Sequence, residues 1–438
     1  MNVSPLVSQF MQHLSQCCSR PLLTHLALIM TTRILAIGAS TITNLSRICG
    51  LNPYASPWHQ VFSRYSFNLW QMSEVILGLI IKCFLQGNTI VLAIDDTTCL
   101  HKGKSVFGRA KHRDGVRSSH SVMIPLLGHK WVVVCVIVKL GISHRHWALP
   151  IAVGLCRSSE FAKMNCRRHK TPAHIARLLI AKIQRKFSKY RFIIVGDQGY
   201  GQHATACAFS SDRLTLVSKF YPDAALYMAP PRRKRGTNGR PPTKGPKLPR
   251  PVDAVRDASL KKTTTTWYGG KPRNVEYTTG TGYWWRSGHD IVQVRWVFVR
   301  DLSGTHRDEY LYSTDVTMSP ATIISLYTAR WAIEVSFQEC KQHLRIEKTR
   351  VWAERSVLTL IPLLFGCYTA IVILGAHSSD TNIRWPKKET IAFSDILLTL
   401  RRTLWKERLF QNSPDLKGPS KFNATDQETI LRALCQAA

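Results

Sequence analysis

Two short apolar runs that end in aspartate constrain the fold of this chain most strongly. The first is "NTIVLAIDD" at residues 88–96, and the second is "RFIIVGDQGYG" at residues 191–201. Runs of this length and composition are typical of strands buried in a mostly parallel sheet. The sequence therefore predicts an α/β domain in which Asp95, Asp96 and Asp197 stand at the ends of core strands.

A further acid, Glu334, lies in the stretch "YTARWAIEVSFQECKQHLRIEK" at residues 327–348. This stretch has neither Gly nor Pro, and its large apolar residues recur at helical spacing, so it predicts one helix. At about 100° per residue, Glu334 falls on one narrow polar stripe of that helix. The stripe also carries Tyr327, Arg330, Gln338, Lys341 and Arg345. Most such stripes are ordinary solvated faces, so its meaning depends on the rest of the chain.

The charge of the chain points to a polyanionic partner. Lys and Arg number 60 against 27 Asp and Glu, which gives a net charge of +33 that is spread along the sequence. Nucleic acid is the commonest such partner, and an anionic membrane surface is the rival. Carboxylates beside a polyanion need compensation, and Mg²⁺ or Mn²⁺ provides it through hard oxygen ligands. Acids on three separate core elements thus predict metal-dependent phosphoryl transfer, in which two ions can cooperate.

These motifs resemble those of the bacterial insertion-sequence DDE transposases. Tyr327, Arg330, Glu334 and Lys341 have the spacing of that group's YREK signature. "LAIDDTTCL" is similar to the stretch that holds its first catalytic Asp, and "GDQGY" is similar to the stretch that holds its second. The resemblance covers residues 90 to 350 and implies an RNase H-like core with a β-rich insertion between its second Asp and its Glu.

The resemblance also implies the catalytic acids and the cofactor. Asp197 and Glu334 are expected to be catalytic and to bind two Mg²⁺ or Mn²⁺ ions. The first acid is ambiguous, because the match "AI-x-DTT" selects Asp96 whereas an Asp-x-Thr pattern selects Asp95. Neighbours in a strand point to opposite faces, so only one of them is expected to reach the metals. Asp96 is slightly favoured.

The remaining signature residues are implied to bind DNA. Tyr327, Arg330 and Lys341 are expected to contact phosphates near the transposon end, and they share the stripe of Glu334. The expected function is therefore a DNA transposase that binds double-stranded DNA at terminal inverted repeats, cleaves it, and joins it to target DNA. A homodimeric synaptic complex and a hairpin intermediate are implied as well. The alternative is a catalytically inactive DNA-binding protein derived from such an enzyme.

The chain divides into five segments by composition. A helical N-terminal region could be a helix-turn-helix-like DNA-binding module or, equally well, a plain helical bundle. The fold class is α/β, an RNase H-like mixed sheet flanked by helices, interrupted by a β-rich insertion and carrying helical terminal regions. The expected segments are 1–85 (helical), 86–219 (first part of the core), 220–320 (basic linker and β-rich insertion), 321–376 (second part of the core with the glutamate helix) and 377–438 (helical).

Two features bear on location. Residues 356–376 form an uncharged stretch that is long enough to span a bilayer. Pro362, Gly366 and several hydroxyl side chains interrupt this stretch, so we expect a helix packed inside the protein and no membrane partner. The 12 cysteines include no Cys-x-x-Cys pair, and the N-terminus lacks the pattern of a signal peptide. These features predict reduced thiols and a location in the bacterial cytosol.

Overall fold

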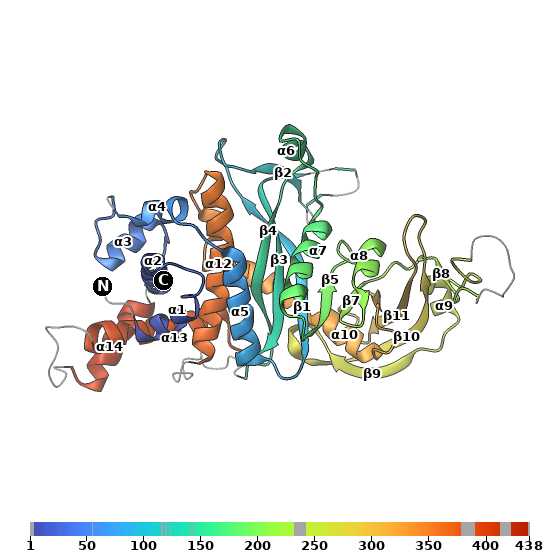
Figure 1. The fold of residues 1–438 in the computed structure, drawn as a ribbon. Coiled ribbons are helices and arrows are strands. Elements are labelled where there is room, and N and C mark those ends of the chain that lie inside the picture. Colours follow the sequence, from blue (N-terminus) through green and yellow to red (C-terminus); the bar gives the residue numbers. More distant parts are fainter. Residues whose placement is uncertain are drawn as a thin grey trace.

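The computed structural model describes residues 4–54, 56–114, 117–118, 121–122, 124–141, 143–231, 242–377, 390–411 and 422–436. A sheet occupies the centre of the molecule, with a helical region on one side and long antiparallel strands on the other (Figure 1). Residues 232–241, which hold much of the expected basic linker, lie outside the described residues.

The core of the sheet has five main strands. They are β1 (Thr89–Leu100), β3 (Pro125–Lys139), β4 (His146–Cys156), β5 (Arg191–Gly196) and β7 (Leu214–Lys219). Their order is β4-β3-β1-β5-β7; β3 is antiparallel to both of its neighbours, whereas β1, β5 and β7 run parallel. The short strands β2 (Ala110–Arg113) and β6 (Ser210–Ser211) pair with β3 and β7. This is the strand order of an RNase H-like core, and it confirms the predicted fold class.

The β-rich insertion continues the core sheet. Its elements are β8 (Leu226–Tyr227), α9 (Pro251–Arg256), β9 (Lys261–Thr266), η1 (Tyr268–Gly270), β10 (Pro272–Trp284), β11 (Val292–Asp301) and β12 (Glu309–Ser313). Strand β12 pairs antiparallel with β7, and β11 and β10 follow outward from it. Among the described residues, the insertion and the core therefore share one sheet of 12 strands.

Helices from both ends of the chain form a single helical region (Figure 1). It contains α1 (Pro5–His13), α2 (Arg20–Leu35), α3 (Ile42–Cys49), α4 (Trp58–Arg64), α5 (Leu69–Phe84), α12 (Glu354–Ala376), α13 (Phe393–Lys406), η3 (Glu407–Gln411) and α14 (Ala424–Gln436). Arg401 of α13 donates to the carbonyl oxygens of Ile34 (2.7 Å) and Ala36 (3.0 Å) at the end of α2. A cation at a helix C-terminus satisfies carbonyl groups that have no partner within the helix.

Helix α12 joins this helical region to the sheet. It is the uncharged segment of the sequence analysis, and it packs against β4, α5 and α13. By length and composition α12 could cross a membrane, and α4 with α5 passes the same test only as a bent pair. In the folded chain, however, 67% of the most apolar window of α12 is buried. The expectation of a helix packed inside the protein is confirmed.

The remaining helices lie around the core sheet and the strands that extend it. They are α6 (Ser159–Met164), α7 (Pro172–Lys186), α8 (His203–Ala208), α10 (Pro320–Ala329), α11 (Ala332–Gln342) and η2 (Ile346–Lys348). Helix α7 packs on β3 and β4, whereas α11 packs on β4 and β1.

A buried carboxylate fixes α11 in place. Glu339 of α11 accepts hydrogen bonds from Arg145 Nη2 (2.7 Å), from the Tyr368 hydroxyl of α12 (2.6 Å) and from the backbone N–H of Phe393 in α13 (3.3 Å). A buried charge is tolerated only when it is paired and hydrogen-bonded, so these contacts act as one unit. We call these four residues the Glu339 cluster.

Removal of one donor from the Glu339 cluster should destabilise the fold. Tyr368→Phe deletes a hydrogen bond to a charged acceptor, which typically contributes about 1.5–3 kcal/mol. We expect the free energy of unfolding, measured by denaturant titration, to fall by about that amount. The matched control is Tyr310→Phe, because the Tyr310 hydroxyl makes no hydrogen bond within the described part of the chain. Equal losses in the two variants would contradict the role of the cluster.

Candidate active site

Asp96 points to the face of the sheet that α7 covers. Strand register places Asp96 beside Val132 of β3, and Val132 beside Gly154 of β4. A Cβ on Gly154 would lie 2.7 Å from Ile175 of α7, so this row of residues faces α7. Side chains directly opposite each other in paired strands share a face, so Asp96 shares this one.

Asp95 points to the opposite face, which α11 covers. Ala93 lies two residues before Asp95, so both side chains are on the same side of β1. Ala93 is in register with Cys135 of β3, and the Cys135 thiol lies against Ser336 of α11. The register therefore brings Asp95, and not Asp96, to the helix that carries Glu334.

Arg330 connects Asp95 with Glu334. Its Nη1 is 2.8 Å from Asp95 Oδ2, and its Nη2 is 3.0 Å from Glu334 Oε1. The side chain of Arg330 is only 10% exposed, whereas that of Glu334 is 35% exposed. One guanidinium thus bridges an acid of the central strand and an acid of the glutamate helix.

The position of Arg330 depends on a tight turn that the sequence did not predict. Instead of one helix over 327–348, the chain forms α10 and α11 with Arg330 and Trp331 between them. The turn makes i→i+3 bonds, including Arg330 N to Tyr327 O (3.2 Å) and Ile333 N to Arg330 O (2.9 Å). Helix α11 ends at Gln342, and Arg345 has a φ of 50°, so Arg345 does not continue the expected stripe.

Asp197 follows β5 in a turn that its glycines make possible. Its Oδ1 accepts from the N–H of Tyr200 (3.2 Å), and its carbonyl oxygen accepts from the Ser218 hydroxyl of β7 (2.8 Å). A Cβ on Gly201 would lie 2.1 Å from Ser218 Oγ, so a larger residue there would push β7 away. The "GDQGYG" sequence is therefore a close-packed turn that holds Asp197 at the C-terminal end of β5.

The electrostatics show that the acids lie close enough to influence one another. The pKa of Asp95 is raised to about 7: burial raises it most, the charge of Arg330 lowers it, and the charge of Asp197 raises it. Burial alone would lower the pKa of Arg330, but Asp95 and Glu334 are among the groups that raise it overall. Burial disfavours the ionised form of a carboxylate and so raises its pKa. An added cation would stabilise that ionised form.

In this arrangement the acids are not gathered around a common point. Within the described ranges, no group of three or more His, Cys, Asp or Glu residues is arranged to hold a metal ion. The guanidinium of Arg330 lies between Asp95 and Glu334 and contacts both. Carboxylate oxygens nevertheless suit a hard divalent cation chemically, and the available ones belong to Asp95, Asp197 and Glu334.

Asp96 has partners of its own on the α7 face. Lys130 Nζ is 3.1 Å from its Oδ2, and the Tyr200 hydroxyl donates to its Oδ1 at 2.8 Å. Sequence reasoning missed both partners. Tyr200 belongs to the quoted "GDQGY" motif and could have been found there, whereas Lys130 stands before an apolar run and gives no such signal. The sequence slightly favoured Asp96 as the first acid; in the structure Asp95, and not Asp96, lies on the face of Glu334.

The expected DNA-binding residues differ in exposure. Tyr327 is buried, and its ring centre is 5.7 Å from the guanidinium carbon of Arg330. Burial raises its pKa. Lys341 is half-buried, donates to the carbonyl oxygen of Thr98 (3.0 Å) and pairs with Glu347 (3.0 Å). Of the three, Lys341 is the most accessible to a ligand in this arrangement.

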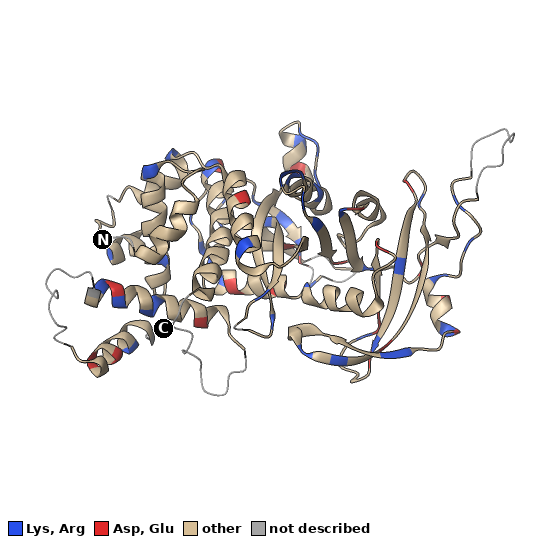
Figure 2. Ribbon diagram, turned by 60° about the horizontal axis from the view of Figure 1, so that its bottom comes forward, with Lys and Arg blue, Asp and Glu red and all other residues tan. Residues whose placement is uncertain are grey.

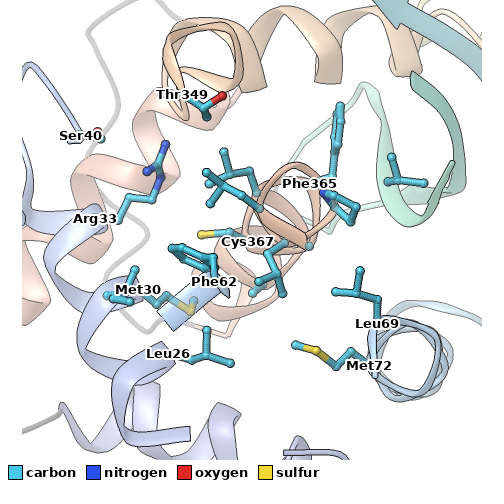
Figure 3. Close-up of a pocket in the computed structure, with 18 of the residues that line it drawn as sticks. Leu26, Met30, Arg33, Ser40, Phe62, Leu69, Met72, Thr349, Phe365 and Cys367 are labelled. Carbon is cyan, nitrogen blue, oxygen red and sulfur yellow. The ribbon is translucent and has the colours of Figure 1, made fainter. Parts of the chain in front are cut away.

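Neither the distribution of Lys and Arg nor the apolar cavity of the helical region singles out these acids. Lys and Arg are scattered over the helices, the core sheet and the insertion (Figure 2). A cavity of about 930 Å³ lies between the N-terminal helices and α12, with Leu26, Phe62 and Phe365 among its lining residues (Figure 3). None of the candidate acids lines it.

Comparisons with known proteins place the chain in a family. A comparison with curated proteins returns no match. Among solved structures, the chain is similar to "Cryo-EM structure of piggyBac transposase synaptic complex with hairpin DNA (SNHP)", with 12% identity and a TM-score of 0.36 over 94% of this chain and 74% of that one. The family described as DDE superfamily endonuclease matches residues 12–273, more than half of the chain, including Asp95 and Asp197. The chain therefore belongs to the DDE superfamily endonucleases.

Proposed function

We propose that this protein is a DNA transposase of the bacterial insertion-sequence type. It binds the terminal inverted repeats of its element, cleaves them, and transfers the freed ends to target DNA. The observation that carries the proposal is the bridge made by Arg330, because it joins an acid of β1 to an acid of α11 beside the acid that follows β5. Membership of an endonuclease family supports it.

We propose Asp95, Asp197 and Glu334 as the catalytic acids that hold Mg²⁺ or Mn²⁺. When bound, such ions activate a nucleophile and stabilise the leaving oxygen in phosphoryl transfer. The protein supplies the oxygen ligands and positions the DNA. Arg330 and Lys341 carry donors for phosphate oxygens, and Arg330 can form the paired hydrogen bonds that suit phosphate geometry.

The partners follow from the charge and the chemistry. A net charge of +33 suits double-stranded DNA, both as element ends and as target. We also propose a homodimer as the synaptic unit, since two ends must be held together, and the bacterial cytosol as the location.

Glu334→Gln should separate cleavage from binding. An amide of the same shape lacks the charge that a divalent cation needs, so nicking of a duplex with the terminal repeat should fall by more than about 100-fold, beyond the usual loss for residues that only support metal ligands. Gel-shift affinity for the same duplex should persist. Glu276→Gln removes a half-buried acid of β10 that pairs only loosely with Lys262 (3.9 Å) and serves as the control. Near-normal nicking by Glu334→Gln would leave Glu334 as an ordinary surface residue.

The two adjacent aspartates should respond differently to the same change. Asp95→Asn should abolish nicking to a similar extent, because Asp95 lies on the face of Glu334. Asp96→Asn should retain nicking within about tenfold, as expected for a residue that does not itself bind the metal. The two variants are mutual controls in one metal-dependent nicking assay. The reverse order of activities would assign the first catalytic acid to the α7 face.

Lys341→Ala should weaken DNA binding through a lost phosphate contact. The slope of log affinity against log salt should become shallower by about 0.9, the value for one phosphate contact. Lys186→Ala is the control, since Lys186 is likewise ion-paired at 3.1 Å, with Glu74, but lies on α7. Gel shifts at several salt concentrations measure both slopes. An unchanged slope for Lys341→Ala would mean that Lys341 serves only its contacts with Thr98 and Glu347.

A further inference from the structure

Arg330 is the shared counter-ion of two proposed catalytic acids. It is the basic residue that contacts both Asp95 and Glu334, and it is the cation that lowers the pKa of Asp95. Its Nε is buried and has no hydrogen-bond partner in the described structure. The guanidinium is therefore held in place by the two carboxylates, and its Nε–H donor is not used.

We propose that Arg330 binds Asp95 and Glu334 in the DNA-free protein and transfers to a DNA phosphate when DNA binds. This inference rests on the proposed function, because it concerns the acids assigned to metal binding. It goes further by making metal affinity dependent on DNA. Before DNA binds, the arginine competes with a divalent cation for the same oxygens; after DNA binds, those oxygens are free.

The geometry favours an exchange of this kind. Arg330 stands in the tight turn between α10 and α11, and the next residue, Trp331, is 47% exposed, so this turn reaches the surface. The more exposed partner is Glu334, whose release requires less rearrangement than that of Asp95. Phosphate and carboxylate both accept paired hydrogen bonds from a guanidinium, so the arginine keeps its bonding when it changes partner.

The sign of the effect distinguishes this role from a purely structural one. Without Arg330, two close carboxylates lose their counter-ion, and their affinity for a divalent cation rises. If Arg330 only supported the fold, its removal would disorder the ligands and lower the affinity. The affinity for Mn²⁺ in the absence of DNA is therefore the decisive quantity.

The test measures Mn²⁺ binding by electron paramagnetic resonance with full-length protein. We expect Arg330→Gln to bind Mn²⁺ about tenfold more tightly than the native protein without DNA, a typical size for coupling between two sites. A short blunt duplex should tighten Mn²⁺ binding by the native protein by a similar factor and have little effect on the variant. Arg300→Gln is the control, since it removes an exposed arginine paired with Asp308 at 2.8 Å. It should behave like the native protein.

Two further measurements make the result decisive. Adding Glu334→Gln to Arg330→Gln should remove the gain in affinity, because one of the released carboxylates is gone. In the native protein, Mn²⁺ should raise the melting temperature clearly more with the duplex than without it, which tests the coupling even if Arg330→Gln does not fold. Folded Arg330→Gln with unchanged or weaker Mn²⁺ affinity would overturn the inference, whereas metal-dependent nicking by the native protein would still support the proposed function. Absence of both Mn²⁺ binding and nicking with DNA present would instead overturn the proposed function.

Discussion

The pleat of one central strand organises the candidate site. Because β1 pairs with β3 on one side and with β5 on the other, the register fixes the face of the sheet on which each of its side chains lies. Asp95 and Asp96 are adjacent in the sequence, yet they take part in separate sets of contacts on opposite sides of the sheet. One includes Arg330 and Glu334, and the other includes Lys130 and Tyr200. A shift of β1 by one residue would exchange the two aspartates.

Much of this architecture was predictable because it follows from local patterns. Apolar runs predicted β1 and β5, and Asp197 follows the end of β5 as expected. Strand β1, however, continues to Leu100 because it stays paired with β3, so Asp95 and Asp96 lie within the strand and not at its end. The faces were not predictable, since they depend on the register between strands that are distant in the sequence. The split of the glutamate helix was also missed. Nothing in "YTARWAIEVSF" marks a break, and the turn at Arg330 is compatible with helical backbone angles. The turn at Arg330 therefore becomes evident only from the structure and not from helical spacing in the sequence.

The larger organisation differs from the order of segments along the chain. Composition separates the two terminal regions, but Arg401 of α13 binds carbonyl oxygens at the end of α2 and unites them. Every residue has a backbone carbonyl group, so the sequence does not show which carbonyls accept from Arg401. The contact between the two terminal regions was therefore not predictable. The insertion is a similar case. Its alternating strands were evident, but only the pairing of β12 with β7 shows that they extend the core sheet.

Because two of its contacts come from α12 and α13, the Glu339 cluster can anchor α11 only late in synthesis. Asp95 and Asp197 belong to strands made early, whereas α11 is fixed by Tyr368 and by the backbone of Phe393, which leave the ribosome much later. A growing chain thus carries two of its acids long before the third is anchored. For an enzyme that cuts DNA, incomplete chains that end before α13 would lack a firmly held Glu334. Under the proposed assignment of the acids, the fold therefore delays the full set until α13 has been made.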